Sequence, residues 1–170
     1  MVPLVALVTL LAWAGGSPAA TSSAVQDTPT VLDLSVVHHD GTVSPLRAIV
    51  RDGPAVVAFW ATYCPPCRAE VPALNRAAEH WRARGLRVLG VALESNERRV
   101  RAAQSTWGIR YDVVWLAPGK DDLLERLFPR GLPVTAFVDH GKVTLHDRVL
   151  DDEELARRVP ALLDGATPDR

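Results

Sequence analysis

The sequence contains two cysteines, Cys64 and Cys67, separated only by Pro65 and Pro66. A disulfide between them would close a very short loop, for which chain entropy predicts about 2 kcal/mol of stabilisation, so the pair is a poor structural cross-link. Two thiolates also fall short of the four ligands of a structural zinc site. Covalent haem attachment needs a histidine directly after the second cysteine, where this chain has Arg68. Thiol–disulfide chemistry therefore explains the pair best.

Such chemistry requires one sulfur that is exposed and that ionises more readily than an ordinary thiol. The free N–H groups and the positive dipole end of a helix N-terminus provide that environment. Because the pattern predicts a strand-to-helix junction at Cys64, we expect Cys64 to attack a substrate disulfide and the less exposed Cys67 to resolve the mixed disulfide. Pro65 and Pro66 lack N–H groups, which leaves fewer donors for the thiolate and favours reduction of partners.

Glu70 lies three residues after Cys67, on the same face of the predicted helix. A partly buried carboxyl with a raised pKa could move the proton that Cys67 loses during resolution. The alternative is an acidic side chain that only complements the helix N-terminus. The residues by themselves leave both roles open.

A buried strand and a kinked helix are expected to position the pair. Six apolar residues without alternation, at 55–60, predict a strand buried on both faces. Apolar residues then recur at spacings of three and four, which predicts a helix at 65–84 with a kink at Pro72. The other expected elements are an opening hairpin from 31 that turns at Asp40-Gly41, strands at 86–93, 111–116 and 134–138, helices at 96–107 and 120–128, a hairpin turn at His140-Gly141 with its second strand at 142–150, and a last helix from Asp151.

With these elements in place, the sequence resembles the thioredoxin superfamily, and within it the TlpA/ResA/DsbE-like extracytoplasmic thiol–disulfide oxidoreductases, over most of residues 30–165. The resemblance is carried by A-F-W-A-T-Y-C-P-P-C-R-A-E-V-P at 58–72, G-L-P-V-T-A-F-V-D at 131–139 and G-K-V at 141–143. It implies an α/β fold: a thioredoxin-like mixed β-sheet flanked by helices on both faces, with an extra N-terminal β-hairpin.

The resemblance also implies roles for individual residues. Pro133 matches a cis-proline that faces the redox site, and Leu132 before it would offer its backbone to the substrate chain. Trp60, close to the motif, is a third residue expected at the substrate. Glu70 matches the family glutamate near the resolving cysteine. Ala58 stands where thioredoxin itself has a buried aspartate, which gives Glu70 more weight.

Two other functional interpretations compete with that of a thiol–disulfide oxidoreductase. A peroxiredoxin-like peroxidase would have Thr or Ser three residues before its reactive cysteine, where this chain has Ala61. A copper-binding module could combine the cysteine pair with a histidine of His38-His39. We expect neither a resident metal nor a cofactor. The formal net charge of −1 gives no electrostatic reason to expect nucleic acid.

The N-terminal segment predicts export. Residues 1–26 carry no charged side chain, and the mostly apolar run at 2–14 has the length of a signal-peptide core, although a positively charged start is missing. We expect a signal peptide or uncleaved anchor at 1–24, one thioredoxin-like domain at 25–166 and a C-terminal tail at 167–170. The mature chain is then expected outside the cytosol, in the periplasm or at the outer face of the membrane.

Partners follow from the resemblance alone. It implies protein disulfide substrates, with apocytochrome c as the leading candidate, and a membrane thiol reductase as the electron donor. The expected state of the protein is a monomer.

Overall fold

The computed structural model describes residues 30–119 and 121–165. The expected signal peptide or anchor and the expected C-terminal tail lie outside these residues. The strands are β1 (Ser35–Val37), β2 (Val43–Pro45), β3 (Ala55–Trp60), β4 (Arg87–Ala92), β5 (Asp112–Leu116), β6 (Val134–Asp139) and β7 (Lys142–His146). The helices are η1 (Val31–Asp33), α1 (Leu46–Val50), α2 (Pro65–Trp81), η2 (Arg82–Arg84), α3 (Glu97–Trp107), α4 (Asp121–Leu127) and α5 (Asp152–Leu163), where η marks a 3-10 helix.

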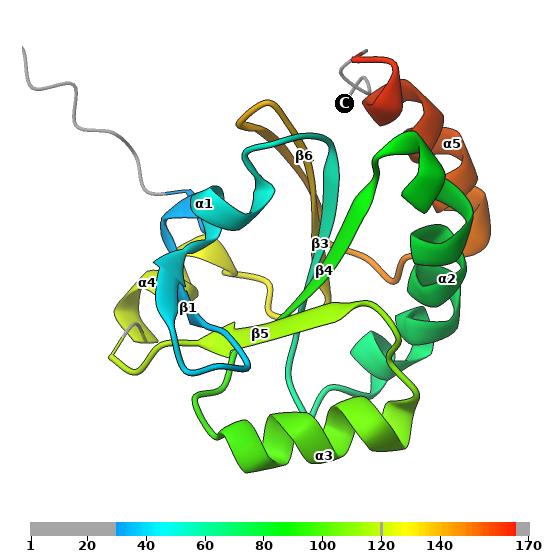
Figure 1. Cartoon of the computed structure of the whole chain (residues 1–170). Helices are drawn as coiled ribbons and strands as arrows, with labels where there is room; N and C mark the ends of the chain where they lie inside the picture. The colour runs from blue at the N-terminus through cyan, green and yellow to red at the C-terminus, as the bar shows by residue number, and fades with distance from the viewer. Residues whose placement is uncertain (1–29, 120, 166–170) are drawn as a thin grey trace, which may run out of the picture.

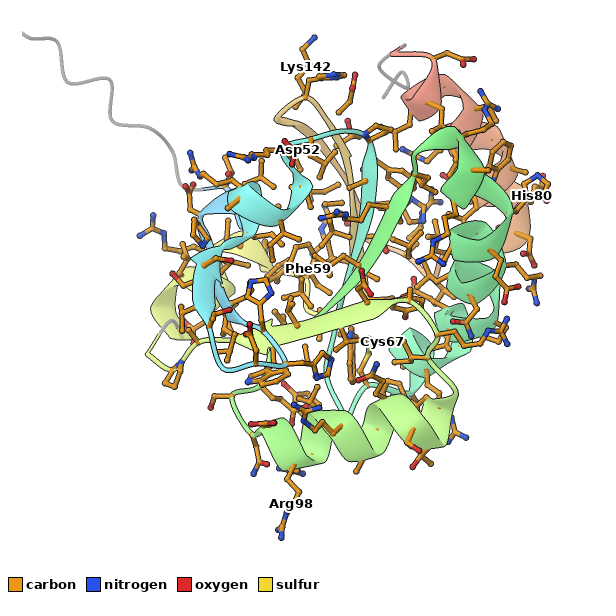
Figure 2. All side chains as sticks on the ribbon, in the orientation of Figure 1. Asp52, Phe59, Cys67, His80, Arg98 and Lys142 are labelled. Carbon is orange, nitrogen blue, oxygen red and sulfur yellow. A yellow bond between two sulfur atoms is a disulfide. The ribbon has the colours of Figure 1, made fainter. Side chains whose placement is uncertain are left out.

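The strands form one mixed sheet in the order β2-β1-β5-β4-β3-β6-β7. In Figure 1, the labelled β3 and β4 run through the middle of the molecule, with α2 and α5 to their right. β3 lies parallel to β4 and antiparallel to β6, and β4 lies parallel to β5. Every residue of β3 is buried, which confirms the prediction of a strand covered on both faces. In Figure 2, the labelled Phe59 of this strand lies in the middle of the molecule, whereas Arg98 and His80 project outward.

Helices cover both faces of the sheet. One core joins α2, α3 and α5 to the face that carries Ala58 and Phe137, and it includes Leu74 of α2 and Val159 of α5. The other core joins α1 and α4 to the opposite face, where Phe59 packs against other apolar side chains. The expected thioredoxin-like layering is confirmed, and it leaves the N-terminus of α2 at the edge of the sheet where β3 ends.

The N-terminal hairpin is present, but its surroundings differ from the prediction. β1 and β2 pair antiparallel around the expected turn, and β1 also pairs with β5. Residues 31–33, expected to be extended, form η1, because Thr30 and Asp33 make a capping box with a 2.8 Å bond from the Thr30 N–H to the Asp33 carboxylate. α1 was not predicted, because five residues are too few to show a helical period.

The chain after β7 also departs from the prediction. The second strand of the C-terminal hairpin was expected to reach residue 150, yet β7 ends at His146. The following five residues cross to α5, whose N-cap is Asp151. Within this crossing, Leu150 is buried and its backbone N–H faces α2. The departure places a backbone donor beside the helix that carries the cysteines.

Burial of His146 is expected to make folding sensitive to mild acid. Burial is the main cause that lowers the pKa of His146, the charges of Arg158 and Arg148 add to it, and Glu154, 3.5 Å from the ring, opposes it. The unfolded chain therefore binds a proton at about pH 6.5 that the folded chain resists, so stability is lost as the pH falls below that value. We expect His146→Gln to lose less stability than the wild type between pH 7.5 and pH 5 in urea titrations. Equal losses in the two proteins would contradict this expectation.

Candidate active site

Cys64 lies at the junction between β3 and α2. Its N–H donates to the Ala61 carbonyl at 3.0 Å, which closes a turn directly after the strand. Its own backbone is extended, and it is the N-cap of α2, with Pro65 and Pro66 in the first helical positions. Proline is favoured there because those N–H groups have no partner within the helix. The predicted strand-to-helix junction is confirmed.

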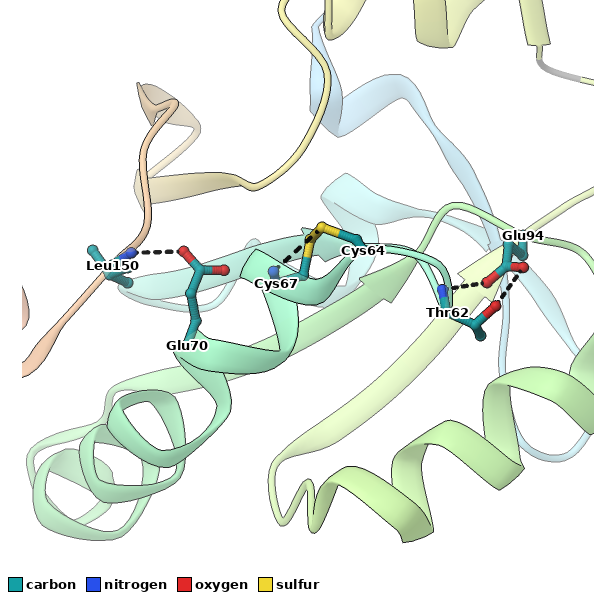
Figure 3. The surroundings of a disulfide bond; sticks show 6 residues. All are labelled: Thr62, Cys64, Cys67, Glu70, Glu94 and Leu150. Atoms are coloured by element: carbon teal, nitrogen blue, oxygen red, sulfur yellow. Dashed lines mark hydrogen bonds between the residues drawn. A yellow bond between two sulfur atoms is a disulfide. The ribbon is translucent and has the colours of Figure 1, made fainter.

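The two cysteines form a disulfide, as Figure 3 shows. Both cysteines are buried, Cys64 at 7% and Cys67 at 3% exposed. The order is the expected one, but the exposed Cys64 that was expected is not found in this disulfide form. Among the described residues, Cys64 Sγ accepts one hydrogen bond, from the Cys67 N–H at 3.3 Å. The intervening Pro65 and Pro66 have no N–H to add, so the helix N-terminus offers the Cys64 sulfur few donors.

Exposed apolar and aromatic side chains lie beside Cys64, and the loop before β6 lies at the same end of the sheet. Tyr63, before Cys64, is 72% exposed, and Pro65 and Pro66 after it are also exposed. The Leu132–Pro133 peptide bond is cis, with Leu132 half-buried and Pro133 buried. Because β6 follows immediately and its first residue pairs with Phe59, this loop lies at the sheet edge where β3 ends. The contact of Leu132 and Pro133 with a substrate stays a prediction.

Glu70 is buried behind the disulfide, one helical turn after Cys67. Its side chain is 1% exposed, and one carboxylate oxygen accepts the Leu150 N–H at 2.7 Å. Burial raises the pKa of Glu70 from 4.5 to about 7, and the hydrogen bond from Leu150 acts in the opposite direction. Burial and the charge of Glu70 also raise the pKa of Tyr111. The raised pKa matches the expectation and suits proton transfer near neutral pH, so the catalytic role of Glu70 remains our prediction.

Trp60, which the sequence analysis expected at the substrate, is buried. Its side chain is 2% exposed and packs against Trp107, with ring centroids 5.1 Å apart. The indole stands so close to β4 that a Cβ built on Gly90 would lie 2.9 Å from its Nε1. Trp60 is therefore part of the core behind the site, and its surface does not support the expected role in substrate binding.

The structure adds Glu94 and Thr62 to the site. Glu94 Oε2 accepts the Thr62 N–H at 2.7 Å, and Glu94 Oε1 accepts the Thr62 hydroxyl at 2.9 Å. Neither residue was singled out from the sequence. A usable signal was present, because Glu94 follows β4, a parallel neighbour of β3, and parallel strands end at the same edge of a sheet.

The histidines proposed for a copper site have other contacts. His38 Nε2 is 2.7 Å from Ser44 Oγ, and the His39 ring packs edge-on against Trp115. In residues 30–119 and 121–165, no three His, Cys, Asp or Glu side chains are grouped so that they could hold a metal ion. The same residues include no helix with the length and apolarity needed to cross a bilayer.

Comparison with known proteins places this geometry in a family. The AhpC/TSA family matches residues 28–146. The thiol:disulfide interchange protein DsbE of Pseudomonas fluorescens biotype C is 33% identical over 146 residues, which cover 80% of this chain and 76% of that protein. The thiol-disulfide oxidoreductase ResA of Halalkalibacterium halodurans is 27% identical over 105 residues, covering 61% of this chain and 58% of that protein.

A solved structure agrees with these relatives. The structure of MTB DsbF in its mixed oxidized and reduced forms has a TM-score of 0.64 and 28% identity, and the match covers 79% of this chain and 98% of that one. The similarity in sequence and the similarity in fold lead to the same conclusion. The chain belongs to the AhpC/TSA family and is a thioredoxin-like thiol–disulfide oxidoreductase of the DsbE/ResA type, with Cys64 and Cys67 as its cysteine pair.

Proposed function

We propose that this enzyme works outside the cytosol, where it reduces disulfides of exported proteins, with apocytochrome c as the leading substrate and a membrane thiol reductase as electron donor. The observation that carries the direction of electron flow is the environment of Cys64 Sγ, which receives the Cys67 N–H while Pro65 and Pro66 offer none. A thiolate that receives few hydrogen bonds is stabilised weakly. The dithiol form then gives up its electrons readily, because a stabilised thiolate is what makes such a pair oxidising.

The surface around the disulfide supports a protein substrate. Tyr63, Pro65 and Pro66 are exposed beside Cys64, and Leu132 is half-buried in the second loop at this edge. An extended segment that carries a disulfide can lie on such apolar groups while its sulfur reaches Cys64. The unfolded haem-binding segment of an apocytochrome, Cys-x-x-Cys-His, is a substrate of this kind.

The proposed location rests on the sequence and on the relatives. Residues 1–26 carry no charge and include an apolar run of signal-peptide length. The similar proteins are named DsbE and ResA, and the resemblance stated above places that group outside the cytosol. A disulfide reductase is useful there, because exported cysteines are readily oxidised.

The direction of electron flow predicts a low reduction potential. Equilibration with glutathione, read by tryptophan fluorescence or thiol titration, should place the Cys64–Cys67 pair well below the value of about −120 mV that is typical of a strong oxidant. Replacing Pro66 by histidine should raise the potential, because the variant regains a backbone N–H at the helix N-terminus and gains a side chain that can be positively charged. A wild-type potential near −120 mV would rule out the proposed reductive role.

A further inference from the structure

The turn that carries Cys64 is hydrogen-bonded to the carboxylate of Glu94, which lies outside the turn. The Cys64 N–H bond to Ala61 makes residues 61–64 a four-residue turn, with Thr62 and Tyr63 at its centre. Both oxygens of Glu94 are engaged by Thr62, one by its N–H at 2.7 Å and the other by its hydroxyl at 2.9 Å. Figure 3 shows this pairing on one side of the disulfide and Glu70 with Leu150 on the other.

Glu94 itself is fixed by the strands and the helix around it. The Leu93 N–H donates to the Trp60 carbonyl at 2.8 Å, so the pairing of β3 with β4 continues to the residue before Glu94. Two residues after Glu94, Asn96 caps α3 by accepting the Arg99 N–H. Glu94 is half-buried between these anchors. The backbone that carries the Glu94 side chain is therefore anchored on both sides of the residue.

We propose that Glu94 is a positioning residue of the redox site: through Thr62 it fixes the turn that aims Cys64, and it places a negative charge beside the loop on which the Cys64 thiolate forms. A fixed turn keeps the attacking sulfur aligned with a substrate disulfide. A nearby negative charge raises the free energy of the thiolate. The charge of Glu94 and the missing N–H groups of Pro65 and Pro66 thus both destabilise the Cys64 thiolate, which makes the pair more reducing.

Two substitutions separate the geometric part from the charge. Thr62→Val removes the hydroxyl donor but keeps the backbone N–H bond and the charge of Glu94. Glu94→Gln removes the charge and offers one acceptor oxygen to the two Thr62 donors. Glu97→Gln is the matched control, because Glu97 is an exposed carboxylate three residues on that binds Arg101 at 2.7 Å. Arg68 and Glu70, the first two charged side chains after the pair in α2, are unchanged in all three variants.

The measurements are the pH dependence of Cys64 alkylation in the reduced protein and the rate of insulin reduction. Glu94→Gln should lower the pKa of Cys64 by about half a unit, which is about threefold more thiolate below that pKa, and should slow insulin reduction several-fold. Thr62→Val should slow insulin reduction while leaving the alkylation profile in place. Glu97→Gln should change neither.

Two results would overturn the proposal. One is an alkylation profile of Glu94→Gln that coincides with those of the wild type and Glu97→Gln. The other is a Thr62→Val protein that reduces insulin at the wild-type rate. If Glu94→Gln does not fold, Glu94→Asp takes its place, because it keeps the charge but withdraws the carboxylate from Thr62; it must slow insulin reduction, and an unchanged rate would refute the positioning role.

Discussion

Replacing Cys67 by serine is expected to arrest the enzyme as a mixed disulfide with its substrate. Cys64 is the N-cap of α2 and the more exposed of the two cysteines, so it should form the first bond. Without Cys67 no thiol is present to resolve that bond, because the sequence has no third cysteine. Cys64→Ser should form no adduct. The reaction of the reduced proteins with Ellman's reagent checks this order: the reduced wild type should release two equivalents of thionitrobenzoate, Cys67→Ser one, and Cys64→Ser should react slowly.

The same Cys67→Ser variant tests the proposed substrate. Incubated with an oxidised Cys-x-x-Cys-His peptide, it should yield an adduct that is visible by mass and is released by dithiothreitol. Expressed in cells as the full chain, it should capture proteins that carry export signals, apocytochromes among them. Capture of cytosolic proteins alone would contradict the proposed location, and it would do so without affecting the assignment of the enzyme as a thiol–disulfide oxidoreductase.

Replacing Glu70 by glutamine is expected to slow the second half of the reaction. Glu70 lies one turn beyond Cys67, and burial raises its pKa to about 7, so near neutral pH it can accept the proton that Cys67 loses. A positioned acid or base of this kind contributes about 100-fold or more to a rate. In stopped-flow experiments with Ellman's reagent, Glu70→Gln should release the first thionitrobenzoate normally and the second about 100-fold more slowly. Normal release of both would leave Glu70 a structural residue.

Glu70→Gln should also change the dependence of stability on pH. The folded chain holds the Glu70 proton up to about pH 7, whereas the unfolded chain loses it near 4.5, so the contribution of Glu70 to stability is complete below pH 4.5 and is lost as the pH rises. At pH 8 this shift in pKa corresponds to a loss of about 3 kcal/mol from the free energy of unfolding. The glutamine can still accept the Leu150 N–H. Urea titrations should therefore find Glu70→Gln more stable than the wild type at pH 8, with a smaller difference at pH 5.

A matched control exists on the same helix. Glu79 is exposed and paired with Arg110 at 2.9 Å, so Glu79→Gln removes an equal charge from α2 without touching the buried site. We expect it to leave the release of both thionitrobenzoate equivalents unchanged. Its stability difference from the wild type should stay nearly constant between pH 5 and pH 8. A pH-dependent gain like that of Glu70→Gln would show that the helix charge, rather than burial, is responsible.

The features that the sequence predicted correctly depend on neighbours along the chain. The apolar run at 55–60 can be a strand only if both of its faces are covered, and the cysteine pair follows it directly, so the junction at Cys64 could be predicted before any contact was known. Asn96 and Asp151 were also predicted helix starts, because an N-cap needs only a side chain that reaches a backbone N–H a few residues on. Local hydrogen bonds and periodicity determine these elements.

The residues that surround the redox pair depend on contacts across the fold. Glu94 meets Thr62 over 32 residues of sequence, and Leu150 meets Glu70 over 80. Neither contact could be predicted from the sequence. The first depends on the pairing of β3 with β4, and the second depends on the path of the chain between β7 and α5, which begins earlier than the sequence pattern indicated. Trp60 is an aromatic residue close to the cysteine pair, which suggested a binding role. Its packing against Trp107 places it in the core, and this contact is not visible in the sequence. The cysteine pair can be recognised from the sequence, whereas the carboxylates beside it follow from the tertiary structure, because burial and charge act through space.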